Sequence, residues 1–302
     1  MRERLSNVIT QVAKRDSRMI VLSGDHGYAL FDEIRKQCSN QFLNVGVMEQ
    51  AMVGMAAGLA KVGARPIVYG LSAFVPIRVL EQIKLDVCYS NLPVIFLGDG
   101  AGLVYTTLGS SHQCAEDVAA LRPLPNIRIY TPSDEHELDA CFEEATRAKG
   151  PSYIRIGKSD RPAVHSGAIP STEPILVNEG TKASCLVSMG SMSAISQSAA
   201  REFGLSHLVF PRVKPFPMDS LRTLASFEHL VVVEEHSRFG GLCSSLLDAF
   251  CESGLRAPRM TSLSLQEKFA EKCGSYQYAL SEHAMDDVSI MSRVRQAVEG
   301  PR

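Results

Sequence analysis

The sequence of 302 residues has no excess of charge of either sign. Its 31 Lys and Arg residues nearly balance 33 Asp and Glu residues, the formal net charge is −2, and the basic residues are scattered. A clustered basic patch is the feature by which proteins hold nucleic acid or an anionic membrane surface. We therefore expect neither a nucleic acid nor a membrane as a partner.

Long apolar runs are missing too. A membrane-spanning helix requires about 20 consecutive apolar residues, and the uncharged run at 51–60 is much shorter, so a buried helix is expected there. Residues 1–16 are charged and helical in pattern, without the apolar core of a secretory signal. The eight cysteines include no CxxC pair, which predicts reduced thiols in a cytoplasmic protein.

Several signatures of enzyme chemistry are also missing. The chain has no GxSxG nucleophile elbow, no HExxH, no GxxxxGK[ST] loop and no GxGxxG fingerprint. Gly98-Asp99-Gly100, followed by Asn126, superficially matches the metal–diphosphate motif of thiamine-diphosphate enzymes. However, Asn126 begins an expected strand and has no second Asn beside it. We therefore expect no metal ligands in this chain.

What the sequence does contain is an alternation of short β-branched runs and helical stretches, which is typical of parallel α/β domains. The length favours two domains, and 45% hydrophobic with 21% charged residues is an ordinary globular composition. The expected fold class is α/β, with two three-layer domains on parallel or mixed sheets. They would cover residues 1–160 and 176–302, joined by a Pro-, Ser- and Gly-rich linker at 161–175.

The apolar patterns place the individual elements. Expected strands cover 19–25, 65–70, 92–100, 126–132, 153–157, 185–190, 207–213 and 230–235. Expected helices cover 46–61, 76–90, 114–122, 134–148, 193–203 and about 241–252, and Ser133 is the expected N-cap of one of them. Residues 234–236 are consistent with either a strand end or a solvated turn.

One carboxylate, Glu49, precedes an uncharged helix of small residues. No basic residue lies within ten positions of it, so a buried Glu49 would require a ligand or a raised pKa. A carboxylic acid with a raised pKa suits hydrogen bonding or proton donation to a cofactor nitrogen. A partly solvated carboxylate, stabilised by the helix dipole, fits the pattern at least as well. Gly54 and Gly58 leave one helix face nearly bare, which predicts close packing by another helix.

A second candidate lies in the loop 98–117, where three glycines follow an expected buried strand. Ligands of open α/β sheets bind at the carboxyl ends of strands. His112 lies in this loop, and an imidazole suits proton transfer near neutral pH. A surface histidine that bonds its neighbours is an equally simple interpretation.

Together these motifs resemble the transketolase family, which includes the deoxyxylulose-phosphate synthases. The segments that carry the resemblance are, in order, NVGVMEQAMVGMAAGLA, VYGLSAFVPIRVLEQIKLDV, LPVIFLGDGAGL, GSSHQCAEDVAALRPLPNIRIYTPSD, YIRIGK, VSMG, RVKPFPMD and VVVEEHSRFGGL. The first five resemble the pyrimidine-binding domain of that family, and the last three its C-terminal domain. The family's diphosphate-binding domain has no counterpart here, so the chain resembles the C-terminal subunit of a split transketolase.

The resemblance implies a transferase that moves a two-carbon ketol unit from a ketose, phosphorylated or modified, to an aldehyde. It implies thiamine diphosphate as cofactor, with Mg²⁺ held by an N-terminal partner subunit in a heterotetramer. Glu49 would bond N1′ of the aminopyrimidine and promote its imino tautomer. Phe74 would pack against the pyrimidine ring, although plain core packing fits this residue as well. Asp25 and Arg78 are the other implied cofactor residues.

The resemblance also implies a set of substrate residues: His112, Asp99, Leu108 and Lys158. His112 matches a histidine that points at substrate oxygens and shuttles protons. Lys158 lies near the place of a family arginine for substrate phosphate, and it supplies charge without the bidentate fork. Leu108 replaces a family aspartate, and Asp99 falls near a family substrate histidine. The cofactor residues therefore resemble the family more closely than the substrate residues do.

Two other classes of function remain open. One is the β subunit of a 2-oxo-acid dehydrogenase E1 or of an acyloin-forming enzyme, which shares this two-domain plan. The segments GSSHQ and YTPSD favour the transketolase side. The other is a non-catalytic regulatory or assembly subunit that keeps the fold.

Overall fold

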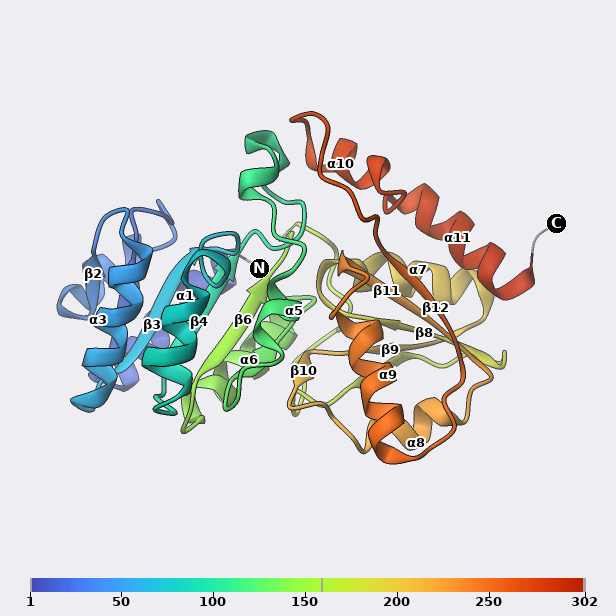
Figure 1. The fold of residues 1–302 in the computed structure, drawn as a ribbon, viewed down its shortest axis with the longest axis horizontal. Helices are drawn as coiled ribbons and strands as arrows, with labels where there is room; N and C mark the ends of the chain where they lie inside the picture. The colour runs from blue at the N-terminus through green and yellow to red at the C-terminus, as the bar shows by residue number, and fades with distance from the viewer. Residues whose placement is uncertain (1, 159, 301–302) are drawn as a thin grey trace.

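The computed structural model describes residues 2–158 and 160–300, which form two α/β units side by side (Figure 1). A seven-stranded sheet has the strand order β10-β5-β6-β4-β3-β1-β2, and a five-stranded sheet has the order β12-β11-β8-β9-β7. Helices cover both faces of each sheet. The structure therefore confirms the expected α/β class with two three-layer units.

The first sheet is parallel except at one edge, where β10 pairs antiparallel with β5. Its strands are β1 (Met19–Ser23), β2 (Phe42–Asn44), β3 (Arg65–Leu71), β4 (Ile95–Asp99), β5 (Arg128–Tyr130), β6 (Ser152–Ile156) and β10 (Arg212–Lys214). One face carries α1 (Arg2–Arg15), α2 (Asp32–Gln37) and α6 (Glu135–Arg147). The other carries α3 (Glu49–Lys61), the short α4 (Leu80–Gln82), the π-helix η3 (Ile83–Cys88) and α5 (Asp117–Leu121).

The second sheet contains β7 (Ile175–Asn178), β8 (Ser184–Ser188), β9 (Ser206–Val209), β11 (His229–Ser237) and β12 (Arg259–Leu265). Helices α7 (Ser193–Phe203), α10 (Tyr276–Glu282) and α11 (Asp287–Glu299) pack on one face, and α8 (Ser220–Ala225) and α9 (Leu242–Ser253) on the other. Across residues 2–158 and 160–300, no helix has the length and apolar character needed to cross a membrane.

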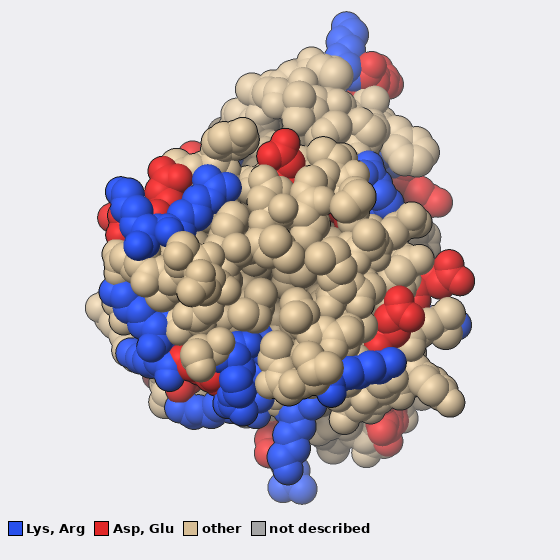
Figure 2. Space-filling model, turned by 90° about the vertical axis from the view of Figure 1, so that its left-hand side faces the viewer, with Lys and Arg blue, Asp and Glu red and all other residues tan. Residues whose placement is uncertain are grey.

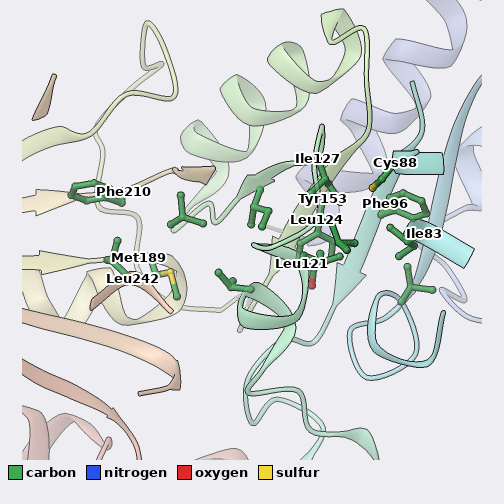
Figure 3. Close-up of a cluster of buried hydrophobic side chains, with 14 of the residues drawn as sticks. Ile83, Cys88, Phe96, Leu121, Leu124, Ile127, Tyr153, Met189, Phe210 and Leu242 are labelled. Carbon is green, nitrogen blue, oxygen red and sulfur yellow. The ribbon is translucent and has the colours of Figure 1, made fainter. Parts of the chain in front are cut away.

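The buried strands read as continuous apolar runs because both of their faces are covered. Successive side chains of a strand point to opposite faces. Val68 and Phe96 accordingly join the apolar cluster under α3, whereas Ile67 and Leu97 join the cluster under α1 and α6. The first of these clusters also extends into the second unit, as Figure 3 shows from Phe96 to Phe210. One apolar core therefore joins the two units.

The single strand predicted over 207–213 is wrong. The chain leaves the second sheet after Val209 and, past Pro211, forms β10 at the edge of the first sheet. Proline has no N–H for a strand ladder, which favours a break at this point. Thr131 of the first unit binds the crossover, since its backbone N–H donates to Pro211 O at 2.7 Å and its hydroxyl to Phe210 O at 2.8 Å.

Other predicted details also differ from the structure. Asp134 caps α6, not Ser133, because its carboxylate accepts from the backbone N–H groups of His136 and Glu137. The helix predicted over 76–90 is instead divided into a 3₁₀ turn η2 (Ile77–Val79), α4 and η3. Helices α2, α8, α10 and α11 and strands β2, β7 and β12 were not predicted. The domain boundaries stay a prediction.

The alternative of a solvated turn at 234–236 is wrong as well. Glu234, Glu235 and His236 lie within β11 and are at most 1% exposed. They are buried because β11 has a neighbouring strand on each side and its carboxyl end meets the first unit. There Arg155 donates to Glu235 O at 2.8 Å and forms a buried ion pair with Asp117 at 2.9 Å. Polar contacts therefore reinforce the apolar core between the units.

Candidate functional site

The expected site residues lie together along the edge of the first sheet that is formed by the carboxyl ends of its parallel strands. Parallel strands end at the same edge, and this edge is where open α/β sheets bind ligands. Asp25 follows β1, Glu49 follows β2, Asp99 ends β4 and Lys158 follows β6. Phe74 and Arg78 follow β3, and His112 lies in the loop after β4, at the end of the 3₁₀ turn η5 (Ser110–His112). The topology alone therefore gathers residues that are far apart in sequence.

Glu49 is the first residue of α3 and is only 4% exposed. Its Oε2 accepts a hydrogen bond from Arg78 at 3.0 Å, whereas its buried Oε1 has no partner among the described residues. The expectation that Glu49 lacks an ion-pair partner holds only along the sequence, since the tertiary structure supplies Arg78. Buried polar atoms are almost always hydrogen-bonded. Oε1 is therefore positioned to accept a hydrogen bond from a ligand.

Phe74 connects this ion pair to His112. The Arg78 guanidinium lies 3.9 Å from the centroid of the Phe74 ring, within the range of a cation–π contact. The His112 ring meets the same phenyl ring edge-on, with centroids 5.2 Å apart. Phe74 is 9% exposed but belongs to none of the three apolar clusters. Phe74 therefore packs against Arg78 and His112, outside these clusters.

His26 lies beside these candidate residues and was missed by the sequence reasoning. Its ring centroid lies 6.0 Å from that of Phe74, and its buried Nε2 has no partner among residues 2–158 and 160–300. It lies in the turn after β1, in which Asp25 and Gly27 both have positive φ, 64° and 81°. The available signal was its place beside Asp25 at a strand end.

Asp25 and Asp99 bind other groups of the chain. The exposed Asp25 accepts a hydrogen bond from the Asn44 amide at 3.1 Å. Asp99 Oδ2 accepts from the hydroxyls of Tyr69 at 2.7 Å and Tyr105 at 3.1 Å. Burial, and then the charge of Asp99, raises the pKa of both tyrosines, so both remain protonated donors. The Asp99 carboxylate is thus held in one orientation at the strand end.

The remaining substrate candidates lie farther along the same edge. Lys158 pairs with Asp160 at 2.9 Å, and its ammonium lies 5.6 Å from the ring centroid of Tyr276 in the second unit. Leu108 is 54% exposed, on the 3₁₀ turn η4 (Thr106–Leu108). Among the described residues, no group of three or more His, Cys, Asp or Glu side chains is arranged to hold a metal ion.

An uncharged surface covers α3 beside this site. Figure 2 shows this face as a broad area with almost no charged side chains, bordered by Lys and Arg at the lower left and by Asp and Glu at the right. Gly54 and Gly58 lie on it, and a Cβ atom built on either would meet no other atom within 4 Å. Met48, just before this helix, and Met55, on it, are 52% and 40% exposed. The close helix packing predicted here is therefore not supplied by the described part of the chain.

Arg78→Met is expected to destabilise the folded chain by about 1–3 kcal/mol, because it leaves both carboxylate oxygens of buried Glu49 without a partner. Urea unfolding of the purified chain measures this change. Arg35→Met is the matched control, since Arg35 also lies over a phenyl ring but pairs with the exposed Asp32 at 3.8 Å. This control should cost less than about 0.5 kcal/mol. Equal losses of unfolding free energy in the two variants would show that pairing with the buried Glu49 contributes no more than pairing with an exposed carboxylate.

Comparisons with known proteins identify a family for this sequence. Residues 1–162 match the family model of the transketolase pyrimidine-binding domain. A subunit of the apulose-4-phosphate transketolase of Actinobacillus succinogenes is 31% identical over 228 residues, which cover 72% of this chain and 73% of that relative. The 1-deoxy-D-xylulose-5-phosphate synthase of Cupriavidus necator is 33% identical over 275 residues, covering 87% of this chain and 42% of the synthase. The chain spans less than half the length of that synthase.

Solved structures show the same similarity. A split-gene transketolase described as an inactive β4 tetramer has a TM-score of 0.88 and 26% identity, and the match covers 100% of this chain and 99% of that chain. A transketolase from Leishmania mexicana has a TM-score of 0.79 and 17% identity, covering 99% of this chain and 45% of that chain. The second similarity is one of fold alone.

Proposed function

Because the chain belongs to the transketolase family, we propose that it is a subunit of a thiamine-diphosphate-dependent enzyme. This enzyme would transfer a two-carbon ketol unit from a ketose to an aldehyde. Glu49 carries the proposal, since one buried oxygen is paired with Arg78 and the other has no partner among the described residues. A carboxylate held in this way suits the ring nitrogen of an aminopyrimidine.

The residues at the sheet edge fit the pyrimidine half of this cofactor. Glu49 would hold N1′ through Oε1, and Phe74 would pack against the ring. When bound, thiamine diphosphate supplies the electron-sink chemistry that breaks and makes carbon–carbon bonds beside a carbonyl. Arg78 keeps Oε2 of Glu49 occupied, so the proton shared with the ring nitrogen would be held by Oε1. The chain itself thus orients the pyrimidine and holds this proton.

The substrate would contact His112 and Lys158. His112 is oriented by a hydrogen bond of 3.0 Å between its Nδ1 and the Ser111 hydroxyl, and by the edge of Phe74. In this position an imidazole would hold or release a proton at a substrate oxygen. The Lys158 ammonium would bind a substrate phosphate, with Asp160 as its present partner. Asp25 and Asp99 would complete the edge, Asp25 beside the cofactor and Asp99 beside the substrate.

We further propose that a separate partner subunit holds the diphosphate and Mg²⁺. The match to one subunit of an apulose-4-phosphate transketolase covers 73% of that subunit, whereas the match to the 1-deoxy-D-xylulose-5-phosphate synthase covers 42% of the synthase. This difference in coverage supports the proposal. It is also supported by the uncharged surface over α3, which offers a large area for contact. A heterotetramer of two such pairs would place each site at a subunit interface. The inactive β4 tetramer of the similar split-gene transketolase fits this scheme.

Co-purification from the native source tests the proposal. The chain alone should neither bind thiamine diphosphate tightly by calorimetry nor transfer a ketol unit. The complex with the co-purified partner should do both with Mg²⁺ present, in a screen of ketose donors against a few aldehydes. Tight Mg²⁺-dependent binding by the chain alone would contradict the divided cofactor site. Decarboxylation of pyruvate without ketose turnover would instead assign the complex to the 2-oxo-acid dehydrogenase or acyloin class.

A further inference from the structure

A buried carboxylate of the second unit, Glu235, contacts three segments near the site. It lies in β11 and is 1% exposed. Its Oε1 accepts a hydrogen bond from Leu103 N at 2.8 Å. Its Oε2 accepts from the hydroxyls of Ser191 and Tyr276, each at 2.6 Å. A buried charge is costly unless it is hydrogen-bonded, and these three donors satisfy both oxygens.

The first contact supports the loop that carries His112. This loop, 102–114, is closed at its neck by two hydrogen bonds between Gly102 and Cys114, of 2.7 and 2.9 Å. Within it, the Thr106 hydroxyl donates to Leu103 O at 2.7 Å and accepts from the Gln113 amide at 2.7 Å. A continuous series of hydrogen bonds and backbone therefore runs from Glu235 to the residue next to His112.

The Glu235 carboxylate also lies directly against the neck of this loop. Gly102 has φ of +74°, and a Cβ atom built on it would lie 2.3 Å from Glu235 Oε1. The position therefore favours glycine both for its backbone conformation and for the space that the carboxylate occupies. Loop and carboxylate are packed against each other as one unit.

The contact with Tyr276 supports the other expected substrate group. Tyr276 begins α10, and the face of its ring lies beneath the Lys158 ammonium at 5.6 Å from the centroid. Burial, and then the charge of Glu235, raises the pKa of Tyr276 well above its usual value, so the phenol stays a donor. Glu235 thus reaches toward Lys158 through one side chain and toward His112 through Leu103.

We propose that Glu235 is a positioning residue that sets the spacing between His112 and Lys158. The second unit would thereby control how the site fits a phosphorylated ketose, without touching the substrate. The identity of this substrate rests on the proposed function, whereas the support of the loop 102–114 does not. A misplacement of a substrate-binding group by about 1 Å lowers rates by up to about 100-fold.

Glu235→Ala in the complete complex tests the inference. We expect the KM for a ketose phosphate donor to rise about 10- to 100-fold, because both supports are lost. The KM for hydroxypyruvate, a ketol donor without phosphate, should rise less, because this donor depends on the position of His112 but not on that of Lys158. Glu235→Gln should recover most of the affinity, since an amide of the same shape still accepts from Leu103 N–H.

Glu234→Ala is the matched control. Glu234 is also buried, at 0% exposed, but it accepts from Leu242 N and Cys243 N at 2.6 and 3.1 Å, within its own unit. Loss of this helix cap should lower stability and leave both KM values near those of the wild type. If both variants raise KM alike, Glu235 contributes only to general stability and the inference is overturned.

A measurement that does not depend on activity separates this inference from the proposed function. Hydrogen exchange at the amides of 103–113 in the complex should be at least about tenfold faster with Glu235→Ala and unchanged with Glu234→Ala. Equal exchange in the two variants would overturn the inference, whatever the substrate. If the wild-type complex transfers no ketol unit but Glu235→Ala still exchanges faster, the support of the loop is established and the proposed function is rejected.

Discussion

Glu49→Gln is expected to lower kcat for ketol transfer by about 10³-fold in the assembled complex, because general acid–base groups contribute about 10²- to 10⁴-fold. The amide keeps the shape of the side chain but cannot share a proton with the cofactor's ring nitrogen as a carboxylate does. Steady-state kinetics at saturating cofactor and donor measure the change. The variant should still assemble with its partner, since Glu49 is only 4% exposed and contributes almost no surface.

The matched control for this substitution is Glu234→Gln. It makes the same chemical change at a carboxylate that is equally buried, 0% exposed against 4% for Glu49. Glu234 lies in β11 of the second unit, and its carboxylate binds the first two backbone N–H groups of α9, so kcat should stay near that of the wild type. Full activity of the Glu49→Gln complex would mean that the chemistry does not run through this chain. The chain would then be a regulatory or assembly subunit.

His112→Asn is expected to lower kcat/KM for the ketose donor by about 100-fold, because an amide cannot take up or release the proton that imidazole transfers near neutral pH. The affinity for thiamine diphosphate should be unchanged, since Phe74 and Glu49 remain in place. Kinetics with a single donor, together with calorimetry of cofactor binding, separate these two quantities. A reduced affinity for thiamine diphosphate with an unchanged kcat/KM would contradict this role of His112.

Ser111→Ala serves as the control for His112. It removes the hydrogen bond to Nδ1, and a neutral hydrogen bond contributes about 0.5–1.5 kcal/mol, or about 2- to 12-fold in rate. An effect equal to that of His112→Asn would indicate that the orientation of the ring matters more than its protons. Wild-type kcat/KM in both variants would leave His112 as a surface histidine.

The alternation of apolar runs was sufficient to predict most of the core strands and helices. Strands such as β3 and β8 are buried on both faces, so their sequences are apolar between their first and last residues. Shorter and partly exposed elements were missed, such as β2 and β7 at the sheet edges, because three or four residues are too few to show a strand pattern. The path through Pro211 into β10 was missed since the partner strand β5 lies far away in the sequence.

The sequence by itself also determined which residues to consider at the site. Glu49 is conspicuous because no other charge lies nearby, and His112 because it follows a glycine-rich strand end. The tertiary structure alone decided their partners. Arg78 comes from 29 positions away along the chain, and Phe74 brings His26 and His112 beside the same ring. The pattern of apolar and polar residues along the sequence does not indicate which distant residues will pair.

The same reasoning applies to Glu235. In the sequence, its segment is as consistent with a solvated turn as with a strand, because two acids and a histidine carry no burial signal of their own. In the fold, β11 lies between two other strands and ends against the first unit, so these side chains lose water and must bind backbone and hydroxyl groups around them. Local sequence determined the elements, and the packing of the two units decided which polar groups became buried partners.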